Sequence, residues 1–85
     1  MTGYIYIGLR TDEDALQFDG YDGVKSAARY ADMIETAAKK SYPDAQITVR
    51  ADQVRTVVES GDEWIDQKIL AIIDQVWQSW EWLTP

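Results

Sequence analysis

The chain has 85 residues, 15 acidic and 8 basic side chains, a net charge of −7 and neither histidine nor cysteine. Without histidine no side chain ordinarily titrates near neutral pH, and without cysteine there are no disulfides, thiolate nucleophiles or soft metal ligands. The acidic balance argues against nucleic acid and anionic membranes as direct partners, because both attract positive charge. We therefore expect one compact domain over residues 1–85 that is cytoplasmic, uses no metal or cofactor and is not an enzyme.

A β-hairpin is predicted at the start of the chain. Residues 4–9 are rich in β-branched and aromatic types, which favours a strand with Ile5, Ile7 and Leu9 on one face. Residues 15–18 read as a short second strand that pairs back onto the first. Two Asp-Gly pairs that follow it mark turns.

A helix is predicted from residue 22 to about residue 40. Asp22 is suited to cap its first turn, and Pro43 prevents its continuation. Small apolar residues recur at helical spacing, so this helix can lie close against a sheet. The predicted buried face consists of Val24, Ala27, Ala28, Ala31, Ile34 and Ala38.

The second half of the chain repeats this pattern faintly. Residues 46–50 predict a strand, and residues 54–58 fit both helical spacing and a β-branched strand, which we favour. Ser60, followed three residues later by Glu63, matches a capping box that starts a helix over residues 61–82. The apolar face of this helix comprises Ile65, Ile69, Ile72, Ile73, Val76, Trp77, Trp80 and Leu83.

The predicted fold is α+β with the order ββαββα. Each half of the chain would supply a hairpin and a helix. Two such units give a four-stranded antiparallel sheet, or a three-stranded one if residues 54–58 are not a strand, with both helices on one face.

Negative charge gathers toward both ends of the chain. Residues 1–24 hold five acids and one base, a net of −4; residues 25–58 hold four acids and six bases, a net of +2; residues 59–85 hold six acids and one base, a net of −5. If the two acidic regions adjoin in the fold, they form a docking surface for a basic partner. A merely solvated acidic surface that aids solubility is the alternative.

Two tryptophans accompany the second acidic region. Trp64 and Trp82 are five helical turns apart, so in one continuous helix they share a direction about 100° from Ile65. They either cover the edge of the core or serve as interface anchors beside carboxylates. The predicted partner-binding residues are Asp12, Glu13, Asp14, Asp19, Asp22, Glu59, Asp62, Glu63, Asp66, Trp64 and Trp82.

Other kinds of site are disfavoured by spacing and charge. The early aspartates lack the alternating order and the terminal glutamate of a calcium-binding loop. Tyr21, Tyr30 and Tyr42 could stack on bases, but single-strand binders also need a strongly positive groove. No base accompanies any serine, and no glycine-rich phosphate loop is present.

In size, acidity and aromatic content, though in no shared motif, the chain is similar to two groups of small inhibitors. These are the phage-encoded anti-CRISPR and DNA-mimic proteins and the acidic immunity proteins that block nucleases. The resemblance implies a non-enzymatic inhibitor that binds a basic, nucleic-acid-binding protein or nuclease by imitating nucleic-acid charge. The alternative is a structural or assembly module that homodimerises through the tryptophan-rich second helix.

Overall fold

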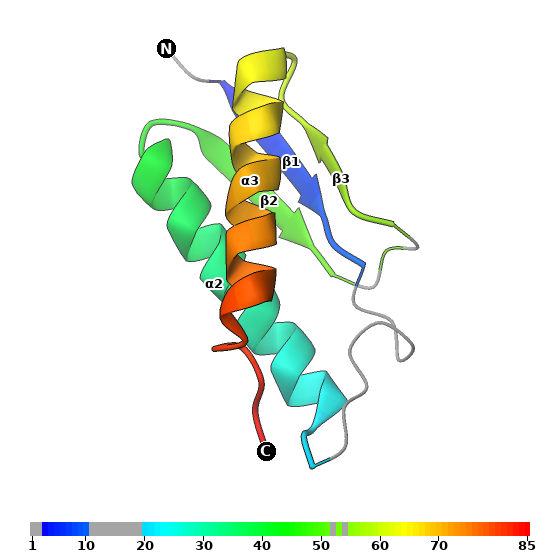
Figure 1. Cartoon of the computed structure of the whole chain (residues 1–85). Helices are drawn as coiled ribbons and strands as arrows, with labels where there is room; N and C mark the ends of the chain where they lie inside the picture. Colours follow the sequence, from blue (N-terminus) through cyan, green and yellow to red (C-terminus); the bar gives the residue numbers. More distant parts are fainter. Residues whose placement is uncertain (1–2, 11–19, 52, 54) are drawn as a thin grey trace.

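The computed structural model describes residues 3–10, 20–51, 53 and 55–85. Its elements are β1 (Tyr4–Gly8), α2 (Gly23–Ser41), β2 (Gln46–Arg50), β3 (Val57–Glu59) and α3 (Glu63–Ser79), shown in Figure 1. The class is α+β, as predicted, but the order is βαββα rather than ββαββα. The strand predicted at residues 15–18 lies outside the described residues.

The sheet is mixed rather than antiparallel. Its order is β2-β1-β3, with β1 parallel to β2 and antiparallel to β3. The prediction of antiparallel pairing was wrong because α2 carries the chain back along the sheet, so that β2 starts at the same end as β1 (Figure 1). The prediction that the two halves of the chain repeat one another is also wrong, because β2 and β3 lie on opposite sides of β1 and do not form a hairpin.

One face of the sheet carries the core, and both helices cover that face (Figure 1). Ile5, Ile7 and Leu9 are fully buried, as predicted from their alternation. Pairing places Ile7 beside Val49 on one side and Val58 on the other. The strand predicted at residues 54–58 is real but shorter and later, at Val57–Glu59.

The helix α2 has the predicted position but buries a different face. The Asp22 Oδ1 atom caps it by accepting from the Lys25 N–H at 3.0 Å. Val24 is 83% exposed and Ala28 is also exposed, so the predicted alanine face was partly wrong. The buried residues recur every four positions and are Ser26, Tyr30, Ile34 and Ala38. The large Tyr30 ring turns the helix toward the core, because it buries more area than alanine.

The N-terminus of α3 is capped by Asp62 and not by the predicted capping box. The Asp62 Oδ1 atom accepts from the Trp64 N–H at 2.9 Å. The Ser60 hydroxyl accepts from the Asp62 N–H at 3.1 Å and donates to the Asp66 carboxylate at 2.7 Å. Because the helix begins at Glu63, Ser60 lies too far upstream to cap it and instead orders the turn before it.

The same helix ends at Ser79, three residues before the predicted Trp82. Trp80 adopts the left-handed conformation, with φ of 59°, and reverses the chain. The Leu83 N–H donates to the Trp80 carbonyl at 3.2 Å. A bulky residue at positive φ is strained, so surrounding contacts must hold it there.

The C-terminal tail is fixed against the start of α2. The Thr84 N–H donates to the Ser26 hydroxyl at 2.9 Å, and the Asp22 N–H donates to the Thr84 carbonyl at 2.7 Å. Trp82 lies in the chain between Trp80 and Thr84, and its side chain is fully buried in the core. The tail is therefore part of the folded domain.

Candidate functional site

The predicted acidic residues do not form one continuous surface in the described part of the chain. Asp22 lies at the start of α2 beside the C-terminal tail, whereas Asp62 lies at the start of α3, at the opposite end of the molecule (Figure 1). Asp12, Glu13, Asp14 and Asp19 lie outside the described residues. The second acidic region is thus the part of the predicted site that the structure brings together.

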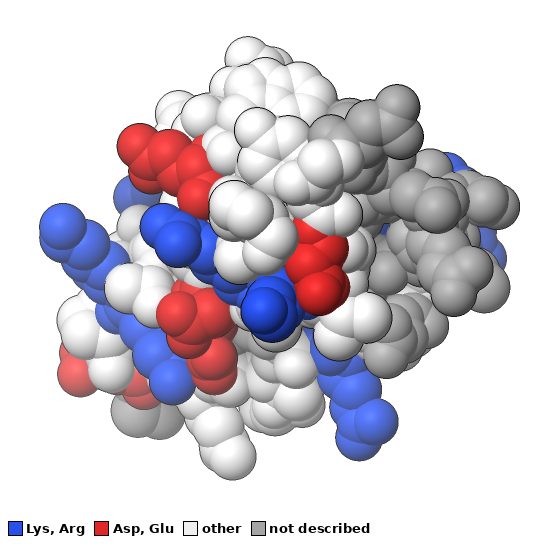
Figure 2. Space-filling model, turned by 90° about the horizontal axis from the view of Figure 1, so that it is seen from below, with Lys and Arg blue, Asp and Glu red and all other residues white. Residues whose placement is uncertain are grey.

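The face around the start of α2 and the C-terminus carries both signs of charge. Figure 2 views the molecule from this end and shows basic and acidic side chains interspersed. Asp22 there is engaged as the cap of α2. Among the residues that the structure describes, this end therefore has no local excess of negative charge comparable to that at the start of α3.

Four carboxylates and one tryptophan gather where β3 leads into α3; we call this group the acidic end. It arises from a tight turn at Gly61, whose φ of 80° is favourable only for glycine. The turn places the end of β3 beside the first turn of α3, where the helix dipole stabilises negative charge. Its members are Glu59, Asp62, Trp64, Glu63 and Asp66.

The carboxylates of the acidic end have no basic partner among the described residues. The salt bridge that the described residues form lies away from the acidic end, within α2, where Lys39 contacts Glu35 at 3.2 Å. Lys68, one turn beyond Trp64, places its ammonium 5.5 Å from the centroid of the Tyr42 ring instead. The negative charge of the acidic end is therefore left uncompensated by ion pairs.

Individual carboxylates differ in what they can offer a partner. Asp62 is the helix cap, and Asp66 accepts a hydrogen bond from Ser60. Glu59 and Glu63 are exposed, and Glu63 makes only a long 3.4 Å contact with the Gln67 amide. Glu59 and Glu63 can therefore be changed with the least damage to the local fold.

Trp64 projects from the acidic end into solvent. Its side chain is 83% exposed, as expected for a residue off the apolar face of the helix. Its backbone N–H bonds to Asp62, so the first helical turn fixes the base of the side chain. A large exposed indole on a fixed helical turn, next in the chain to the acidic residues Asp62 and Glu63, is the kind of residue that anchors protein–protein interfaces.

Trp82 belongs to the core rather than to this surface. It is fully buried, stacks on Trp77 with ring centroids 4.9 Å apart, and lies 5.3 Å from the Tyr30 ring. Its Nε1–H donates to the Trp77 carbonyl at 3.2 Å. The expectation that it shares a direction with Trp64 was wrong, because the helix stops at Ser79 and the chain reverses. Trp82 is therefore not available as a surface anchor.

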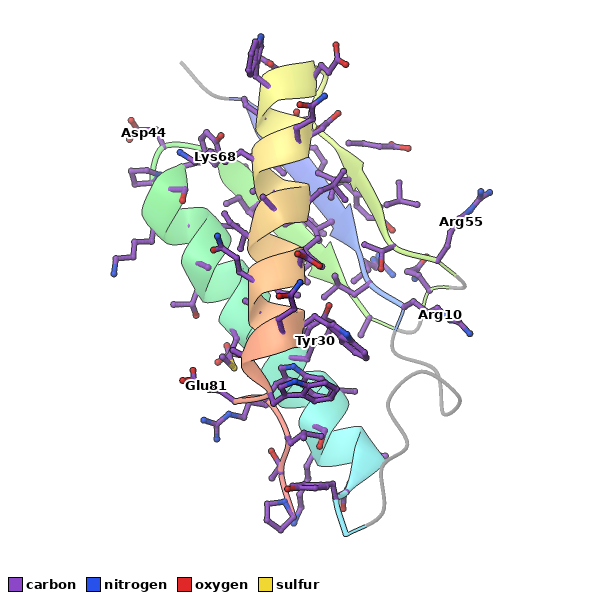
Figure 3. The ribbon with its side chains drawn as sticks, viewed as in Figure 1. Arg10, Tyr30, Asp44, Arg55, Lys68 and Glu81 are labelled. Carbon is purple, nitrogen blue, oxygen red and sulfur yellow. The ribbon has the colours of Figure 1, made fainter. Side chains whose placement is uncertain are left out.

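Tyr30 is likewise structural and cannot stack on a base. Its side chain lies under α3 (Figure 3), in edge contact with Trp77 at 5.8 Å. Burial raises the pKa of its hydroxyl to about 12, with the nearby Asp74 carboxylate adding to the effect. Tyr30 therefore remains neutral at physiological pH.

A shallow pocket that the sequence did not reveal adjoins this aromatic cluster. It has a volume of about 290 Å³ and is lined by Arg10, Tyr30, Thr56 and Trp77. The Arg10 N–H donates to the Thr56 hydroxyl at 3.4 Å, and the Arg10 and Arg55 side chains project from this corner of the sheet (Figure 3). Its residues come from four separate segments of the chain, so no local sequence motif predicts it.

Metal and membrane sites find no support in the residues that the structure describes. Within them, no three acidic side chains converge to hold a metal ion. Neither described helix is long and apolar enough to cross a membrane. Comparison with family models, curated proteins and solved structures finds no match to the chain.

Proposed function

We propose that the chain is a small non-enzymatic protein that binds a basic surface of another protein through its acidic end. One observation carries the proposal: Trp64 is 83% exposed in the first turn of α3, the same turn that begins beside carboxylates with no basic partner in the described residues. An exposed indole costs solubility and contributes nothing to the core. Its location among uncompensated charges is explained if a partner covers both.

The two components of the acidic end have different physical roles. Exposed carboxylates such as Glu59 and Glu63 attract a positive surface over about a Debye length, roughly 8–10 Å at physiological salt, and so accelerate association. Trp64 gains free energy only after contact, when its ring leaves water. A buried tryptophan anchor is commonly worth about 2 kcal/mol or more.

A nucleic-acid-binding protein or a nuclease is the partner class that this chemistry favours. Such proteins hold lysine and arginine side chains in position for phosphate groups. The four carboxylates where β3 leads into α3 offer these side chains an alternative anion, with Trp64 adding an apolar contact. On this proposal the chain competes with nucleic acid for the partner.

Homodimerisation through α3 is the alternative. Trp77 and Trp82 pack against each other and against Tyr30 inside one molecule, which uses up much of the apolar surface that this alternative needs. On α3, Trp64 and Leu70 are exposed but six residues apart, which places them about 120° apart around the helix rather than on one stripe; Trp80, also exposed, lies at the C-cap where the chain leaves the helix. These observations favour the partner proposal over the dimer.

The test compares charge reversals at two places on the molecule. E59K/E63K reverses two carboxylates of the acidic end, whereas D32K/E81K reverses two exposed carboxylates elsewhere; Glu81 lies near the far end of α3 (Figure 3). Both variants change the net charge from −7 to −3. Partners are captured from a lysate of the producing cells, and the captured protein is then titrated in isolation.

We expect the isolated partner to bind wild type and D32K/E81K similarly and E59K/E63K at least tenfold more weakly. W64A should dissociate faster with little change in association rate. Equal losses in the two double variants would mean that net charge alone acts. No loss in E59K/E63K and W64A would refute the acidic end as the binding surface.

A further inference from the structure

The strand β2 forms a border of the sheet with one regular pattern of hydrogen bonds. The Gln46 N–H donates to the Gly3 carbonyl at 3.0 Å, and the Leu9 N–H donates to the Arg50 carbonyl at 2.8 Å. In a parallel ladder, alternate residues of a strand face the same neighbour. The peptide groups of Gln46, Thr48 and Arg50 therefore face β1.

The peptide groups of Ile47 and Val49 consequently point away from the sheet. No described residue forms a hydrogen bond with them on that side. The edge runs for five residues without proline, lysine or a bulge, the devices that commonly protect exposed edges. At the other border, β3 has three residues, and only Val58 turns its peptide groups outward.

The helix layer leaves room for another strand beside β2. Packed helices lie about 8–10 Å apart, whereas neighbouring strands lie about 4.8 Å apart, so two helices cover about four strands. Here two helices cover three strands. Of the described strands, the backbone of α2 comes closest to β2, at the border of the sheet (Figure 1).

A second copy of the chain does not fit this edge. Antiparallel pairing of β2 with its own copy would place both α2 helices on the same face, over adjacent strands. Their axes would then be about 4.8 Å apart, well below the 8–10 Å that packed helices need. A single extended segment without its own helix meets no such obstacle.

The charges around β2 indicate what that segment carries. The strand itself contains Arg50 and no acidic residue, and α2, which lies against it, holds four basic and two acidic residues in a chain whose net charge is −7. Arg50 is exposed at the end of the strand. Side chains beside Ile47 and Val49 would face the core side, under α2, and so would be apolar.

We propose that the outer edge of β2 binds an extended acidic segment of a partner protein as a fourth strand, with alternate apolar side chains beneath α2. The segment pairs with the peptide groups of Ile47 and Val49, and its outward carboxylates lie near Arg50. This surface is separate from the acidic end, and the inference does not depend on the function proposed above.

Amide hydrogen exchange of the full chain, followed by NMR, tests the proposal with a blocked seven-residue peptide of alternating Glu and Val. Saturating peptide should slow exchange at Ile47 and Val49 at least tenfold, and a Lys-Val peptide should bind at least tenfold more weakly. Val49→Pro removes one outward N–H and should lose binding, whereas Val49→Ala, which shortens the same side chain but keeps the N–H, should retain it.

Several results would overturn the proposal. These are unchanged exchange at Ile47 and Val49, equal binding of the two peptides, or full binding by a folded Val49→Pro variant. If Val49→Pro does not fold, loss of the peptide effect in Val49→Ala would overturn it as well. The E59K/E63K and D32K/E81K variants, which have the same net charge, should bind the Glu-Val peptide equally; a different affinity in E59K/E63K would place the peptide at the acidic end and contradict the β2 site.

Discussion

Truncation of Trp82 should strongly destabilise the protein, although the residue lies only three positions from the C-terminus. Its ring is fully buried, stacks on Trp77 at 4.9 Å and contacts Tyr30 at 5.3 Å. Removing a buried tryptophan costs about 3–5 kcal/mol, and small domains have only about 5–15 kcal/mol of stability in total. Trp82→Ala should therefore lose a large share of the folding free energy.

Two further variants make this prediction quantitative. Trp82→Phe keeps an aromatic ring but loses the 3.2 Å hydrogen bond to the Trp77 carbonyl, and should cost about 1–2 kcal/mol. Trp64→Ala removes an exposed side chain and should change stability by less than about 0.5 kcal/mol. Urea unfolding followed by far-ultraviolet circular dichroism gives all three values. A cost below about 1 kcal/mol for Trp82→Ala, or equal costs at Trp82 and Trp64, would refute the packing of the tail.

Four other outcomes follow from the described contacts. Because folding raises the pKa of Tyr30 from 10 to about 12, the stability that the neutral hydroxyl contributes is complete below pH 10 and is lost as the pH rises from 10 to 12; Tyr30→Phe should flatten that part of the stability profile. Trp80→Gly should be more stable than Trp80→Ala by about 1 kcal/mol in thermal unfolding, because φ is 59° there. Ile69→Ala should lower the free energy of unfolding by about 2–5 kcal/mol, and Ile72→Ala should lower it less because Ile72 is only half-buried. Equal urea midpoints for the two variants would contradict the orientation of α3. Asp62→Ala should cost about 1 kcal/mol through the lost cap, whereas a neutral result would favour Ser60 as the cap.

Local patterns in the sequence predicted the elements but not their pairing. The alternation around Ile5 and the cap at Asp22 depend on neighbours a few residues away, and the structure confirms both. The parallel pairing of β1 and β2 depends on where α2 returns the chain, which no local motif encodes. The antiparallel prediction therefore failed.

The two tryptophans of the predicted site also show that local sequence patterns do not predict tertiary contacts. Trp64 lies in the regular first turn of α3, so helical geometry placed it off the apolar face; that it is exposed rather than covering the edge of the core is shown only by the structure. Trp82 lies beyond Trp80, whose positive φ is rare for a bulky residue and is stabilised by tertiary contacts. The burial of Trp82 and the separation of Asp22 from the acidic end could be learned only from the three-dimensional structure.

The central claim, that the acidic end binds a basic partner, is tested most directly by the salt dependence of binding. The dissociation constant of the isolated partner is measured by calorimetry at about 50 and 200 mM salt, because screening weakens exposed charge pairs over this range. We predict that affinity falls steeply with salt for wild type and D32K/E81K, and that E59K/E63K binds weakly with little salt dependence. Identical salt dependence in all three proteins would contradict the claim.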